Sequence, residues 1–132
     1  MRRWFLGLAL VLGAALSASA QATATPPEPK LPLTRILFVF DASYSMHGRW
    51  ESGTKMETAQ RLMGRFLDSL AALPQPNFQL ALRAYGHQKP VPPQDCEDTR
   101  LEVPFAPDNA GKIKKRIQSL RPMGTTPIAR SL

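Results

Sequence analysis

Three segments of the chain have the apolar pattern of β-strands. Residues 35–40 contain an unbroken apolar run, which predicts a central strand covered on both faces of a sheet. Residues 78–85 alternate apolar and polar positions and predict a second strand, which Gly86 ends. Residues 100–105 predict a short third strand, and we place it at a sheet edge because Pro104 has no amide hydrogen for a ladder bond.

A helical pattern follows the first strand and returns near the C-terminus. In residues 55–73, apolar side chains recur at spacings of mostly three and four, which predicts an amphipathic helix ended by two prolines. Asp108 is expected to cap a second helix that runs to about Leu120. Thr126 is expected to cap a third helix with Pro127 in its first turn, and the chain stops as that helix begins.

The order of these elements, which is strand, helix, strand, strand, helix and the start of a helix, predicts one α/β domain. A chain of 132 residues has room for no more than one domain. Three strands and little more than two helices cannot cover both faces of a central strand. We therefore expect the natural domain to continue beyond Leu132, so that this chain is a fragment truncated after the third helix begins.

The first twenty residues have the pattern of a secretory signal peptide. Two arginines precede an apolar run, and small residues follow it up to the expected cleavage after Ala20. A membrane anchor is the alternative, but the run is too short to span a bilayer. We expect a signal peptide at 1–20, a proline-rich extended linker at 21–33 and a partial domain at 34–132, exported to the periplasm or secreted.

The charge of the chain does not favour a nucleic-acid binder. The whole chain has 17 Lys and Arg against 10 Asp and Glu, and removing the two signal-peptide arginines leaves a net charge of +5. A nucleic-acid surface would concentrate such charge together with aromatic side chains. The tight basic cluster lies instead in the second predicted helix, where a solvated face accounts for it: Lys112, Lys114, Lys115 and Arg116.

The first predicted strand ends in a loop rich in oxygen donors. Asp41, Ser43 and Ser45 form the motif D-x-S-x-S at the carboxyl end of that strand, where open α/β sheets bind their ligands. Magnesium takes oxygen ligands and keeps several waters. A cation held by two neutral hydroxyls and few carboxylates would still attract an incoming acid. The alternative is that Asp41 and Ser43 only cap backbone amides of a turn.

Three segments together resemble the von Willebrand factor type A family, which has a metal-ion-dependent adhesion site, and look most like its bacterial exported members. They are 36–46 (ILFVFDASYSM), 83–87 (RAYGH) and 124–129 (GTTPIA). D-x-S-x-S alone is a weak signal, but its place after an apolar strand and about eighty residues before G-x-T-P makes it specific. The resemblance implies an open, Rossmann-like, doubly wound, mostly parallel sheet.

The same resemblance implies a set of metal ligands. Ser43 and Ser45 would bind the ion directly, Asp41 through a water, and Thr126 from the second loop. The ion would be Mg²⁺, with Mn²⁺ or Ca²⁺ as alternatives. The family also uses an aspartate after a later strand, which this sequence does not reach. Tyr44 stands where a glycine is common, and we expect its ring to lie at the rim of the site, where it would contact a partner with Met46 beside it or partly shield the metal.

These features favour a metal-dependent protein-binding module over an enzyme. A partner's Asp or Glu would complete the coordination of the ion. A scaffold with a degenerate, non-metal-binding site is the alternative. A hydrolase using Ser43 or Ser45 is disfavoured, because the chain has no G-x-S-x-G elbow and no base spaced for either serine. His87 has no acid spaced for it, and ordinary packing is the preferred interpretation.

Cys96 is the one cysteine of the chain. It lies in the polar stretch 94–98 between the second and third predicted strands, so its thiol is expected to be exposed. In an exported protein it is either a free thiol or one half of a disulfide. The resembled bacterial members carry a cysteine after their last metal-site aspartate. By that likeness, Cys96 is a disulfide candidate whose partner would lie beyond Leu132.

Overall fold

The computed structural model describes residues 32–73 and 77–132. The signal peptide expected at 1–20, nearly all of the linker and the prolines expected to end the first helix lie outside the described residues. Of the helices described, none is long and apolar enough to cross a membrane.

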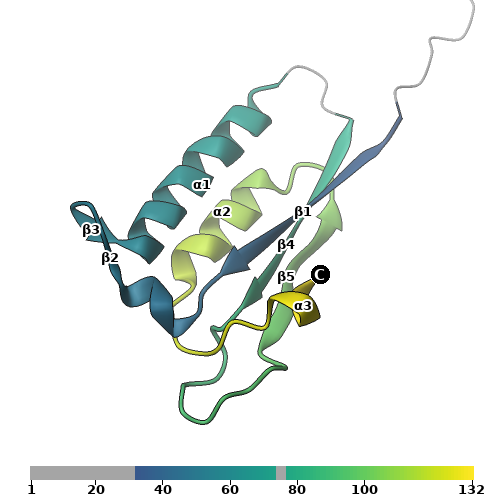
Figure 1. Ribbon diagram of the computed structural model, residues 1–132. Helices are drawn as coiled ribbons and strands as arrows, with labels where there is room; N and C mark the ends of the chain where they lie inside the picture. The colour runs from purple at the N-terminus through teal and green to yellow at the C-terminus, as the bar shows by residue number, and fades with distance from the viewer. Residues whose placement is uncertain (1–31, 74–76) are drawn as a thin grey trace, which may run out of the picture.

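The described elements are strands and helices mixed along the chain, as Figure 1 shows. The first three strands and two helices are β1 (Thr34–Asp41), the 3-10 helix η1 (Tyr44–His47), β2 (Arg49–Trp50), β3 (Gly53–Thr54) and α1 (Lys55–Ala71). The remaining elements are β4 (Phe78–Tyr85), β5 (Thr99–Ala106), α2 (Ala110–Ser119) and α3 (Ile128–Ser131). Helix α1 therefore ends two residues before the predicted Leu73, and β4 has the predicted bounds. The small β2–β3 hairpin was not expected from the sequence.

The sheet is mixed and not doubly wound, so the predicted fold class is wrong. Its order is β1-β4-β5, with β1 parallel to β4 in a register that runs from Thr34 opposite Phe78 to Asp41 opposite Tyr85. Strand β5 pairs antiparallel with β4. A parallel neighbour needs a crossover, whereas β4 and β5 are joined by a loop without a helix. The chain thus forms a small mixed α/β fold with a separate two-stranded antiparallel hairpin.

The prediction that β1 is the central strand is also wrong for the described residues. Strand β4 is central, β1 lies at one edge and β5, as predicted, at the other. Phe40 is buried and Ile36 and Phe38 are half-buried against the core, whereas Leu37 and Val39 on the opposite face are more than a third exposed. The unbroken apolar run therefore forms a strand that is covered on one face.

The core lies between one face of the sheet and the helices α1 and α2, which run side by side in Figure 1. Leu67 of α1, Ile113 and Ile117 of α2, and Leu80 and Leu82 of β4 are all at most 1% exposed. The Gln60 side chain of α1 donates to the carbonyl of Ile117 at 2.9 Å, which ties the two helices together. Helix α3 packs on β4 and β5.

Two predicted helix caps are wrong by one residue each. The N-cap of α2 is Asn109, not Asp108, and the Asn109 side chain donates to the carbonyls of Leu80 and Pro104 instead of to its own helix. The N-cap of α3 is Pro127, so Thr126 precedes the cap. Thr126 is therefore available for another role at the surface.

Candidate metal and partner site

The D-x-S-x-S loop is folded on itself by two hydrogen bonds. Asp41 is the last residue of β1, and its Oδ1 accepts from the backbone amide of Ser43 at 2.8 Å. Ser43 has an extended backbone and is the N-cap of η1. This conformation brings the hydroxyls of Ser43 and Ser45 to 3.1 Å from each other. Ser43 is buried and Ser45 exposed, so the pair lies at the surface end of the strand.

The segment that carries Thr126 lies against this loop. Gly124 forms an isolated parallel bridge with Ser43, and its carbonyl accepts from the amide of Tyr44 at 2.8 Å. The amide of Met123 donates to the carbonyl of Ala42 at 3.2 Å. Thr126 follows two residues later with an exposed side chain. The two motifs that are eighty residues apart in sequence thus meet at the carboxyl ends of β1 and β4.

Glycine is required at the point where these segments meet. Gly86, directly after β4, has a φ of +70°, and a Cβ there would lie 2.5 Å from the carbonyl oxygen of Thr125 and 2.6 Å from Cα of Ser43. A Cβ on Gly124 would lie 2.5 Å from the carbonyl oxygen of Lys89 and would collide with the carboxylate of Asp98. The sequence pattern marked Gly86 only as the end of a strand.

Tyr85 adds a buried contact to Asp41. Burial raises the pKa of Tyr85 to about 12, and the charge of Asp41 and a hydrogen bond to its carboxylate add to the effect. The Tyr85 hydroxyl therefore remains protonated at neutral pH and donates to the carboxylate. The Asp41 carboxylate is therefore fixed in position by two hydrogen bonds, one from the amide of Ser43 and one from the hydroxyl of Tyr85.

The two residues expected to face a partner differ in exposure. Tyr44 is 61% exposed, and its ring meets the ring of His47 edge-on with centroids 5.2 Å apart. Met46 is half-buried and packs against the core. Tyr44 is therefore accessible to solvent, whereas Met46 packs against the core.

A hollow of about 310 Å³ lies beside Tyr44. The exposed Cys96 is one of its lining residues, and its thiol is free in the described structure. The predicted exposure of this thiol is therefore confirmed. The lining residues are Tyr44, Val91, Gln94, Cys96, Gly124, Thr125, Thr126 and Pro127.

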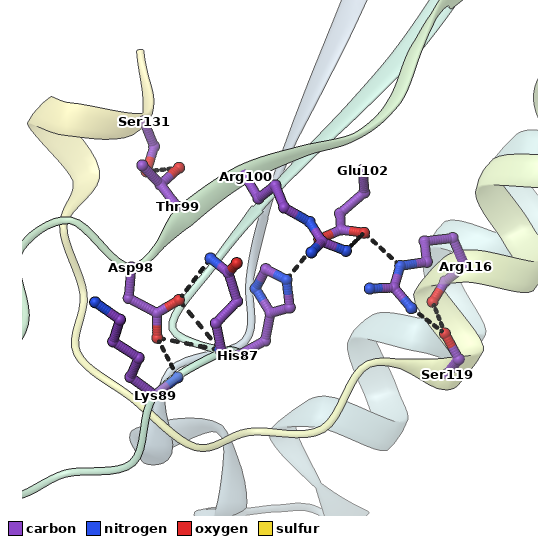
Figure 2. Close-up of polar contacts among 10 residues, drawn as sticks. His87, Lys89, Asp98, Thr99, Arg100, Glu102, Arg116, Ser119 and Ser131 are labelled. Atoms are coloured by element: carbon purple, nitrogen blue, oxygen red, sulfur yellow. Dashed lines mark hydrogen bonds and ion pairs between the residues drawn. The ribbon is translucent and has the colours of Figure 1, made fainter.

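His87 does have an acid partner, contrary to the sequence interpretation. Figure 2 shows its ring beside Glu102 of β5, with 2.6 Å between His87 Nε2 and Glu102 Oε1. Arg100 and Arg116 also donate to Glu102, at 2.8 and 2.6 Å. Burial by itself would raise the pKa of Glu102, but hydrogen bonds from Arg116, Arg100 and His87 outweigh it and lower the pKa to about 2. The side chains of His87 and Glu102 are 4% and 2% exposed, whereas those of Arg100 and Arg116 are 56% and 34% exposed, so the two arginines cover this buried pair from the surface.

Asp98 is a second buried acid that the sequence did not single out. It is 1% exposed, and its carboxylate accepts hydrogen bonds from the loop that follows β4, as Figure 2 shows. Its neighbour Asp95 is more exposed, pairs with Lys89, and accepts from the Thr125 hydroxyl through its backbone carbonyl. Asp95 therefore connects the loop 86–98 to the segment that carries Thr126, whereas Asp98 ties the two ends of that loop together.

Within residues 32–73 and 77–132, no three His, Cys, Asp or Glu side chains are grouped as a metal site. The ligands expected here are mainly hydroxyl oxygens of serine and threonine, which differ from a site built of three His, Cys, Asp or Glu side chains. The candidates for holding an ion are Asp41, Ser43 and Ser45 in one loop at the carboxyl end of β1, and Thr126 in the segment that is hydrogen-bonded to this loop.

Comparison with known proteins yields a likeness in fold alone. Neither a family model nor a curated protein matches the chain. An uncharacterized membrane spanning protein from Vibrio fischeri aligns with a TM-score of 0.53 and 15% identity, over 76% of this chain and 46% of that one. A D319A mutant of the PilB minor pilin from Streptococcus sanguinis aligns with a TM-score of 0.51 and 19% identity, over 76% of this chain and 24% of the pilin. The chain thus spans less than half of either protein, and its mixed α/β fold is similar to a part of each.

Proposed function

We propose that the loops at the carboxyl ends of β1 and β4 bind a divalent cation, and that the protein binds an acidic protein partner through this ion. The observation that carries the proposal is the spacing of the Ser43 and Ser45 hydroxyls, 3.1 Å. Adjacent ligands of an octahedral Mg²⁺ lie about 2.9 Å apart, because each is 2.0–2.1 Å from the ion. The two hydroxyls therefore fit one Mg²⁺, and Mn²⁺ or Ca²⁺ would be alternatives.

Each residue of the loop has a distinct part in this proposal. Ser43 and Ser45 ligate the ion directly. Asp41, whose carboxylate is already engaged by Ser43 and Tyr85, contributes charge and holds an ion-bound water. Thr126 supplies a hydroxyl from the second segment. The motif resemblance to the von Willebrand factor type A family at residues 36–46, 83–87 and 124–129 supports this assignment.

The partner would present an Asp or Glu to the remaining positions on the ion. Three neutral hydroxyls and one carboxylate leave a divalent cation with net positive charge, so an acid is attracted to it. The exposed ring of Tyr44 would contact the partner beside the ion, since aromatic side chains are enriched at protein interfaces. The signal-peptide pattern supports action outside the cytoplasm, in the periplasm or as a secreted protein.

A binding role is favoured over catalysis by the positions of the two histidines. His47 is bonded to the carbonyl of Pro122 at 3.1 Å, and His87 to Glu102. The hydroxyl of Ser43 has Ser45 as its hydrogen-bond neighbour and not a base. A serine nucleophile needs a base within hydrogen-bond reach.

The second candidate function is a protein scaffold without a metal. It is favoured by the hydrogen bond from the Ser43 amide to Asp41, which is the geometry of an Asx turn and needs no ion. The two functions differ in the role of the Ser43 and Ser45 hydroxyls, which bind an ion in the first and have no ligand in the second.

Calorimetric titration of the chain with MgCl₂ and MnCl₂ distinguishes them. We expect saturable binding by the wild type and its loss in the Ser43→Ala/Ser45→Ala double variant, which keeps Asp41. Ser69→Ala is the matched control, because Ser69 lies on α1 and donates only to the carbonyl of Arg65. Binding that survives the double variant, or an absence of saturable binding in the wild type, would leave the scaffold as the better description.

A further inference from the structure

We infer that Asp98 is the positioning residue of the candidate site: its buried carboxylate fixes the loop after β4, and through that loop it places the Thr126 segment against Ser43. The ligand-binding part of this inference rests on the proposed function. Asp98 itself acts through other residues and is not offered as a metal ligand.

The carboxylate of Asp98 is engaged by the start of the loop. Its Oδ1 accepts from the backbone amide and the side-chain amide of Gln88, both at 3.1 Å, and its Oδ2 accepts from the amide of Lys89 at 3.2 Å. The backbone carbonyl of Asp98 also accepts from the amide of Gly86 at 2.9 Å. With its side chain and its backbone carbonyl, Asp98 therefore binds three of the first four residues after β4, which are Gly86, Gln88 and Lys89.

Gly86 transmits this constraint to the second segment. Its carbonyl accepts from the amides of Met123 at 3.1 Å and Gly124 at 2.8 Å. The carbonyl of Gly124 in turn accepts from the amide of Tyr44. A continuous series of hydrogen bonds thus joins Asp98 to the residue between the two candidate serine ligands.

Close packing makes the same connection. Gly124 lies so near to Asp98 that a Cβ on it would collide with Oδ2, and the carbonyl of Lys89 would be 2.5 Å away. At 1% exposure, the carboxylate cannot be replaced by bulk water as an acceptor for these amides. An asparagine would keep the shape but replace one accepting oxygen by a donating NH₂ group, which would face an N–H donor of Gln88 or Lys89.

The test compares Asp98→Asn and Asp98→Ala with Glu97→Gln. Glu97 is the adjacent acid of the same loop, but its side chain is 62% exposed and pairs with Arg130, so it controls for the loss of one charge. The first measurement is amide hydrogen exchange of the metal-free full chain by NMR, at Gly124 and Tyr44. The Leu67 amide in the middle of α1 serves as a reference for global unfolding.

We expect exchange at Gly124 and Tyr44 to accelerate by about tenfold or more relative to Leu67 in both Asp98 variants, and to stay unchanged in Glu97→Gln. Equal acceleration at all three amides would mean a general structural role and would overturn the inference, as would no acceleration. The second measurement is titration with MnCl₂, for which we expect affinity to fall by about 10- to 100-fold in the Asp98 variants alone. If the wild type does not bind Mn²⁺, the proposed function fails, while the exchange measurement still decides the role of Asp98.

Discussion

The negative charges of two buried carboxylates, those of Glu102 and Asp98, are stabilised by different kinds of hydrogen-bond donor. Glu102 is surrounded by charged donors, since Arg100, Arg116 and His87 all bond to its carboxylate. Asp98 accepts hydrogen bonds from amides of the loop it holds. Hydrogen bonds to charged donors are roughly twice as strong as those between neutral groups, and they favour the ionised acid. Protonation of Glu102 at low pH should therefore weaken these hydrogen bonds and lower the free energy of unfolding, which can be measured.

Acidification is expected to destabilise the protein between about pH 5 and pH 2 through Glu102. Its pKa is about 2 in the folded protein against an ordinary value of 4.5, so the folded state favours the carboxylate. The resulting stability, on the order of 2 kcal/mol, is present above the unfolded pKa and is lost as pH falls toward the folded pKa. Urea unfolding at a series of pH values measures this, and Glu102→Gln should be less stable at pH 7 and show a shallower dependence. Glu97→Gln, at an exposed position, should keep the wild-type slope.

Sequence reasoning found the site residues that form a local motif and missed those that long-range contacts define. The grouping of Asp41, Ser43 and Ser45 follows from their spacing within five residues. The role of Gly86 depends on a positive φ and on backbone atoms from two other segments, which no local pattern encodes. Glu102 is 15 positions from His87, and only the antiparallel return of β5 brings the two together.

Helix α1 begins at a capping box that can be tested by one substitution. The Thr54 hydroxyl accepts from the amide of Glu57 at 3.1 Å, and the Glu57 carboxylate accepts from the amide of Thr54 at 2.8 Å. Thr54→Ala should lower the free energy of unfolding by about 1 kcal/mol, because the amide of Glu57 loses its acceptor. Ser69→Ala in the same helix should change it by less than about 0.5 kcal/mol. Equal effects of the two substitutions in denaturant titrations would contradict a specific contribution of the cap.

The positions of the elements and the parallel pairing of β1 with β4 were predictable from the sequence, whereas the direction of β5 and the helix caps were not. The periodicity of residues 55–73 and 78–85 gives α1 and β4 to within two residues, and the helix between them accounts for the parallel pairing of β1 and β4. The direction of β5 depends on the conformation of the loop 86–98. The amino-acid composition of that loop does not determine this conformation. The cap of α2 moved to Asn109 because the positive φ of Asp108 places that residue in the preceding turn.

In the described part of the molecule, α1 and α2 form one layer against a single face of the sheet, and the short helix α3 packs on β4 and β5. Figure 1 shows β1 along one side of the three-stranded sheet, with α1 and α2 behind the same face. The candidate site lies at the carboxyl end of β1. One edge of this same strand pairs with β4, and no other described strand pairs with its second edge. Leu37 and Val39 on the opposite face are more than a third exposed. An apolar strand with one free edge is a template for pairing with another chain.

We expect the chain to associate through the edge of β1 as its concentration rises. Exposed strand edges are protected in natural sheets by charged side chains, especially lysine, and β1 has none between Ile36 and Phe40. Leu37→Lys, at a side chain that is 37% exposed, should reduce light scattering at a given concentration roughly by half or more. Leu62→Lys makes the same change at a side chain of α1 that is 57% exposed, away from any strand edge. If Leu62→Lys suppresses scattering as strongly, exposed apolar area in general, and not the free edge of β1, is the cause of association.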